Sequence, residues 1–123
     1  MPSIAVDKPY AFLAIVLTIG VFVLGGQSWS ATMIGKAVPS WHYVAHLGSF
    51  AVIALSYALA LPRTSLLMIA SLATVVGGAH ELYQLLTPAH DAELDDFLVN
   101  TAGAIFGAIA SRILLFGRTP RPN

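Results

Sequence analysis

The chain has 123 residues, of which 57% are hydrophobic and 10% are charged, and its formal net charge is zero. Because a soluble globular domain carries about 25% charged residues, this composition excludes an ordinary soluble fold and predicts a single-domain integral membrane protein. The sequence has no cysteine, which excludes disulfides and thiolate sites, and no basic patch, which argues against a nucleic-acid partner.

Hydropathy divides the chain into four apolar segments, each long enough to approach or cross a hydrocarbon core of about 30 Å. The predicted helices cover about residues 10–27, 41–61, 65–86 and 96–116. Pro9 suits the first turn of a helix, residues 62–64 form a tight turn, and Thr87 with Pro88 ends the third helix. The sequence therefore predicts an all-α four-helix transmembrane bundle with short loops.

The first segment has a competing interpretation as a signal peptide. Lys8 precedes the apolar run, and the small residues Ser28, Ser30 and Ala31 follow it. A retained helix fits the close spacing of the later segments better, so we expect the first segment to remain part of the protein.

The basic residues predict how the chain is oriented. Four spans place both termini on one side of the membrane, together with Lys8, Arg63, Arg112, Arg118 and Arg121. The other side receives Lys36 alone. Because cytoplasmic loops carry the excess of Lys and Arg, both termini are predicted to be cytoplasmic, and the acidic loop after Pro88 is predicted to face outward.

Polar residues from three helices fall at one depth near the predicted outer surface. A rise of about 1.5 Å per residue places Glu81 about 24 Å above the start of its helix, and places His46 and Asn100 roughly 6–7 Å below the same surface. The predicted polar site consists of His46, Glu81, Gln84, Asp96 and Asn100. A charge at the centre of a membrane helix costs about 2.5–3.5 kcal/mol, so these groups are expected to be partnered or functional.

Small residues continue the polar stripe of the fourth helix. Asp96, Asn100, Gly103 and Gly107 recur at spacings of four, three and four, which keeps them on one helix face. Since small residues let helix backbones approach closely in lipid, Gly103 and Gly107 are predicted to pack against another helix.

Other polar residues have simpler interpretations. We expect His42, next to Trp41, to lie at the membrane interface, His90 to be solvated, and Asp95 to cap the fourth helix at least as readily as it serves a site.

A metal site is the sharpest alternative for this region. The segment His80-Glu81-x-x-Gln84 resembles the zinc-binding HExxH helix, but Gln84 replaces the second histidine, and glutamine is a poor zinc ligand. His46 or His90 could complete such a site, yet the spacing does not require it. We therefore expect no metal and no cofactor.

The chain resembles the VanZ-like family of small bacterial membrane proteins. The resemblance rests on HELYQLLTPAH, on LDDFLVNTAGAIFG and, more weakly, on HLGSF from His46. The family pattern is matched over some 27 residues by Glu81, Gln84, Pro88, Asp96, Asn100, Gly103 and Gly107. Three positions depart from that pattern: His80 stands where the family usually has aspartate, His90 where it has arginine, and Tyr43 where it has lysine.

The resemblance implies a multi-pass protein of the bacterial inner membrane. The name-giving member is associated with lowered susceptibility to the glycopeptide teicoplanin, and a role in antibiotic resistance does not transfer automatically to this chain. We expect a non-enzymatic protein whose polar pocket, open to the outer leaflet, binds a cell-envelope lipid, a glycopeptide or a partner protein. The alternatives are a membrane enzyme acting on a lipid or cell-wall precursor, with Glu81 or Asp96 as general base near His46, and a small proton-coupled transporter.

Overall fold

A computed structural model describes residues 5–26, 39–87 and 93–116 of the chain. This part contains four helices: α1 (Lys8–Gly25), α3 (Pro39–Ala60), α4 (Leu66–Gln84) and α5 (Leu94–Phe116). Each is long and apolar enough to cross a membrane. The predicted all-α four-helix bundle is confirmed. The helix ends differ from the predicted ones by at most two residues; α4 ends at Gln84 rather than 86, and α5 begins at Leu94 rather than 96 and ends at Phe116 as predicted.

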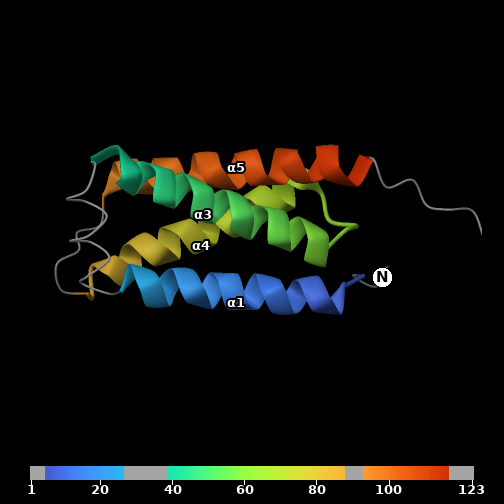
Figure 1. The fold of residues 1–123 in the computed structure, drawn as a ribbon, viewed down its shortest axis with the longest axis horizontal. Helices are drawn as coiled ribbons and strands as arrows, with labels where there is room; N and C mark the ends of the chain where they lie inside the picture. Colours follow the sequence, from blue (N-terminus) through green and yellow to red (C-terminus); the bar gives the residue numbers. More distant parts are fainter. Residues whose placement is uncertain (1–4, 27–38, 88–92, 117–123) are drawn as a thin grey trace, which may run out of the picture.

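The helices run alternately up and down, as Figure 1 shows. α3 and α4 lie between α1 and α5, and the beginning of α1 and the end of α5 lie at the same end of the bundle. The most extensive helix contact is the one between α3 and α5. α1 packs against α3 and α4. Two hydrogen bonds join this part of the chain to α3: the Asp7 N–H donates to the Ala60 carbonyl at 2.9 Å, and the hydroxyls of Thr18 and Tyr57 lie 2.8 Å apart. α1 is therefore an integral part of the bundle.

Short local signals define the turn between α3 and α4. The Thr64 N–H donates to the Leu61 carbonyl at 3.0 Å, which closes the turn after Ala60. Ser65 is the N-cap of α4, and its side chain accepts a hydrogen bond from the Met68 N–H at 3.2 Å. This turn makes α3 and α4 antiparallel neighbours.

The centre of the bundle is built largely from small side chains. Ala54 on α3, Ala73 on α4, and Ala104 and Ala108 on α5 are completely buried. Phe50 on α3 is the largest side chain among them. Because lipid is as apolar as leucine, helices in a bilayer gain more from close backbone packing than from burying large apolar groups.

Gly103 and Gly107 make the contact between α5 and α3 possible. A Cβ atom on Gly103 would collide with the carbonyl oxygen of Leu47, and one on Gly107 would collide with the carbonyl oxygen of Ala51. Both glycines are buried against a neighbouring helix, so the backbones of α3 and α5 touch directly along this stripe.

Large apolar side chains cover the outside of the bundle. Phe12 on α1, Leu67 and Val75 on α4, and Phe106 and Ile113 on α5 are all strongly exposed. Such surface would be unstable in water, but it matches the hydrocarbon of a bilayer. Large apolar groups thus cover the outside of the bundle, while its interior combines small and polar groups with a few large apolar ones such as Phe50.

Candidate functional site

The polar side chains of the bundle gather near one end, where α3 begins, α4 ends and α5 begins. Five titratable residues come together here: His42 and His46 on α3, His80 and Glu81 on α4, and Asp96 on α5. Asn100 lies beside them. We call these six residues the polar site. Three helices therefore contribute to it, as the sequence predicts, although two of its members were not among the predicted site residues.

Asn100 joins α3 to α4 at the centre of the polar site. Its side chain is fully buried. The Asn100 Nδ2 donates to Glu81 Oε1 at 2.8 Å, and the Asn100 Oδ1 lies 2.8 Å from His46 Nδ1. A carbonyl oxygen can only accept, so His46 Nδ1 is the donor in this second bond. The amide thus satisfies a carboxylate on one side and an imidazole on the other.

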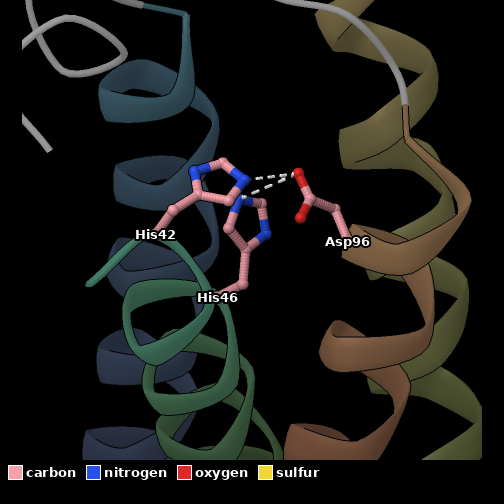
Figure 2. A group of neighbouring side chains, drawn as sticks. All are labelled: His42, His46 and Asp96. Carbon is pink, nitrogen blue, oxygen red and sulfur yellow. Dashed lines mark hydrogen bonds and ion pairs between the residues drawn. The ribbon is translucent and has the colours of Figure 1, made fainter. Parts of the chain in front are cut away.

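Asp96 faces the two histidines of α3, as Figure 2 shows. Asp96 Oδ2 lies 2.7 Å from His42 Nε2 and 3.6 Å from His46 Nε2. Asp96 is 2% exposed, and α5 packs closely against α3. The rings of His42 and His46 lie 4.6 Å apart between their centroids, as expected for residues four apart on one helix face.

His80 closes the site on the side of α1. Its Nδ1 lies 3.5 Å from Glu81 Oε1, and its ring makes edge contacts with Phe22 and Phe50. A Cβ atom on Gly25 would collide with His80 Nε2, so the glycine lets the end of α1 pack against this ring.

Gln84 is placed differently from the other predicted residues. It lies one turn beyond Glu81 on α4 and is 4% exposed. Among the described residues, no hydrogen bond joins its side chain to His46, Glu81, Asp96 or Asn100. The structure thus links four of the five predicted site residues directly and places Gln84 next to them.

His42 is the main residue that sequence reasoning placed elsewhere. Instead of serving only as an interfacial residue, its ring reaches Asp96, while its side chain stays 36% exposed at the rim of the polar site. The spacing of four between His42 and His46 is the signal that could have identified it. Asp95 remains exposed and accepts a hydrogen bond of 3.3 Å from the Tyr43 hydroxyl. His90 lies outside the described residues.

The charges of the polar site are not balanced by lysine or arginine in the described part of the chain. The basic residues described there, Lys8, Arg63 and Arg112, belong to the opposite end of the bundle, where Arg112 Nη2 lies 3.4 Å from the Thr64 carbonyl oxygen. Glu81 and Asp96 therefore face histidines and an amide. Buried carboxylates need paired positive charge or hydrogen-bond donors, so the histidines supply the local compensation.

Several buried polar atoms of the site have no hydrogen-bond partner within the described residues. These atoms are His80 Nε2, Glu81 Oε2 and Asp96 Oδ1. An unpaired buried polar group costs about 1–3 kcal/mol. The three atoms give the site the capacity to accept hydrogen bonds from a polar ligand or to bind a cation.

The fold and the polar site define a four-span helical membrane protein with a buried His, Asp and Glu network. Comparisons of the chain with protein-family models, with curated proteins and with solved structures find no match.

Proposed function

We propose that this chain is a VanZ-like protein of the bacterial inner membrane that binds, without chemical conversion, the polar headgroup of a cell-envelope lipid. The polar site would lie near the outer leaflet, with both termini in the cytoplasm. The observation that carries the proposal is the set of buried, unpartnered atoms at one end of the bundle, namely Glu81 Oε2, Asp96 Oδ1 and His80 Nε2.

The chemistry of the polar site favours a headgroup with hydroxyl or amine groups. Glu81 and Asp96 each offer an unpaired carboxylate oxygen, which accepts hydrogen bonds. The described lysine and arginine residues belong to the opposite end of the bundle, so none of them is at the polar site to bind a bare phosphate. The site residues other than His42 are buried or, for His46, nearly so, and His42 is 36% exposed at the rim, so we favour a small headgroup over a bulky glycopeptide or a partner protein.

The test is mass spectrometry of lipids that co-purify with the protein in mild detergent. Wild type should retain a hydroxyl- or amine-bearing envelope lipid above its share in the membrane, and Glu81→Gln should lose this enrichment. Glu93→Gln is the matched control, because it makes the same change at an exposed residue outside the site. Equal lipid profiles for wild type and folded Glu81→Gln would refute the proposal.

The same spectra distinguish binding from the enzymatic alternative. The pair of His42 Nε2 and Asp96 Oδ2 at 2.7 Å has the arrangement of an imidazole base oriented by a carboxylate, and the imidazole is accessible at the rim. A retained lipid of unchanged mass supports binding. A lipid product of changed mass, formed by wild type and absent with Asp96→Asn, would support an enzyme instead.

A further inference from the structure

Three potential ligand atoms converge where the beginning of α3 meets the beginning of α5. His42 and His46 project from successive turns of α3 towards Asp96 on α5 (Figure 2). One nitrogen of each histidine and one oxygen of Asp96 all lie within 4.8 Å of one another. Two imidazoles and a carboxylate form a ligand set that suits zinc and other divalent first-row transition metals.

The hydrogen bond from His46 to Asn100 fixes which ring nitrogen faces Asp96. Since His46 Nδ1 donates to Asn100 Oδ1 at 2.8 Å, a neutral His46 carries its proton on Nδ1 and a lone pair on Nε2. That lone pair lies 3.6 Å from Asp96 Oδ2, which also bears lone pairs. His46 Nε2 and Asp96 Oδ2 would then both be acceptors, and a cation or a proton between them would stabilise this arrangement.

The surroundings of Asp96 also favour a bound cation. The carboxylate is 2% exposed, and its Oδ1 is buried without a hydrogen-bond partner in the described part of the chain. No described lysine or arginine reaches it. The only described groups that reach it are the imidazoles of His42 and His46, which are themselves metal ligands. A bound divalent cation would compensate this carboxylate directly, and coordination of a metal is one of the two usual solutions for a buried charge.

We propose that His42 Nε2, His46 Nε2 and the Asp96 carboxylate bind one divalent transition metal ion of the zinc class. Ligands about 2.0–2.1 Å from a tetrahedral ion lie roughly 3.3 Å apart. The distances of 2.7 Å and 3.6 Å from Asp96 Oδ2 to the two imidazole nitrogens bracket this value, and the partly exposed His42 ring has room to move outward.

The neighbouring hydrogen bonds have the form of an outer shell that orients a metal ligand. Histidines that bind metals usually donate their other ring N–H to an oxygen, which fixes the ring and strengthens the ligand. Here His46 donates to Asn100, and Asn100 in turn donates to Glu81 Oε1 at 2.8 Å. Glu81 on α4 therefore supports the ion indirectly, through Asn100 and His46.

A second group, formed by His46, His80 and Glu81, fits a metal less well. Its atoms are also within 4.8 Å of one another. However, His46 Nδ1 and Glu81 Oε1 in this group already bond to Asn100, so a metal there would have to break both hydrogen bonds. The metal site that the sequence argues against is centred on His80 and Glu81 of α4. The ligands favoured by the structure come from α3 and α5 instead.

Three protein ligands leave a fourth position open to the rim, where His42 is exposed. A hydroxyl oxygen of the headgroup proposed above could occupy that position, but zinc binding does not depend on the lipid. The two proposals therefore fail separately, since the metal is measured in the absence of added lipid.

The test is metal content after purification with a tag that lacks histidine, followed by dialysis against Zn²⁺ or Co²⁺ alone. Wild type should retain one ion per chain, and bound Co²⁺ should give the visible absorption of a low-coordinate nitrogen and oxygen site. His42→Gln should lower zinc affinity at least roughly tenfold and remove the cobalt spectrum. Because His42 is at the rim, this variant should keep the helical circular dichroism of wild type.

Matched variants separate this site from other sources of binding. Asp96→Asn should lose the ion, while the neighbouring exposed Asp95→Asn should keep it. His80→Gln removes a ligand of the second group alone and so separates that group from the three proposed ligands. Wild type without metal, equal metal in all folded variants, or loss in His80→Gln with retention in His42→Gln would each overturn the proposal.

Discussion

Asn100 connects the acidic and histidine parts of the polar site. It is fully buried, it donates to Glu81, and it accepts from His46. An amide suits this position because it can donate and accept at once, which neither a carboxylate nor an aliphatic side chain can do. One residue therefore determines the hydrogen bonding of both partners.

Asn100→Leu should destabilise the protein by about 2–6 kcal/mol. The substitution is close to isosteric, but it leaves both His46 Nδ1 and Glu81 Oε1 without their Asn100 partner, at about 1–3 kcal/mol for each buried group. Unfolding in mixed detergent micelles, followed by circular dichroism, measures the change.

Thr101→Val is the control for this prediction. The Thr101 hydroxyl donates to the Phe97 carbonyl of its own helix at 2.9 Å, so its removal leaves no isolated partner in the site. We expect a change of less than about 0.5 kcal/mol. Equal stability of Asn100→Leu and wild type would show that the amide is dispensable.

At the scale of the helices, the close approach of α3 and α5 brings His42 and His46 within reach of Asp96. The approach depends on Gly103 and Gly107, which lie against the backbone carbonyls of Leu47 and Ala51. Larger residues would separate the helices and widen the polar site. The packing stripe and the site are therefore parts of one interface.

Gly107→Ala should destabilise the bundle by about 1–3 kcal/mol, because the new methyl group would overlap the Ala51 carbonyl oxygen. Gly48→Ala is the matched control: a Cβ at Gly48 meets nothing within 4 Å. The control should be neutral or stabilising by up to about 1 kcal/mol, since alanine favours a helix over glycine. Both variants are compared by the same unfolding measurement. Equal effects of the two substitutions would contradict the packing role.

At the scale of the whole molecule, charge is separated between the two ends of the bundle. Lys8, Arg63 and Arg112 belong to the end that holds the start of α1, whereas Glu93, Asp95 and Asp96 belong to the end with the polar site. Lys36, Arg118 and Arg121, which the orientation prediction also uses, lie outside the described residues. The described basic residues are thus grouped at one end of the bundle, as the predicted orientation requires.

Single cysteines can test the orientation, since the chain has no native cysteine. In intact cells, a membrane-impermeant thiol reagent should label Glu93→Cys and leave Arg63→Cys unlabelled, because the positive-inside rule puts the Arg63 end in the cytoplasm. Both positions are exposed, so both should react after the membrane is permeabilised. The opposite labelling pattern would place the polar site on the cytoplasmic side.

The sequence by itself determined the class of fold. Four apolar segments of spanning length, separated by proline-rich or polar residues, predict four membrane helices because a lipid-exposed backbone must satisfy its own hydrogen bonds. The depth argument also placed His46, Glu81, Asp96 and Asn100 in one layer, since helix rise is nearly constant. These inferences need only local geometry.

Only the tertiary structure decided which polar atoms meet. The packing of α3 against α5 brings His42 to Asp96, and the packing of α1 and α3 against α4 brings Phe22 and Phe50 to the ring of His80. Helix period places His42 on the same face as His46, but it does not give the contact with Asp96 or the surroundings of His80, because both depend on the close packing that Gly103, Gly107 and Gly25 permit. Residue spacing fixes the face of a helix, but the neighbouring backbone fixes what that face touches.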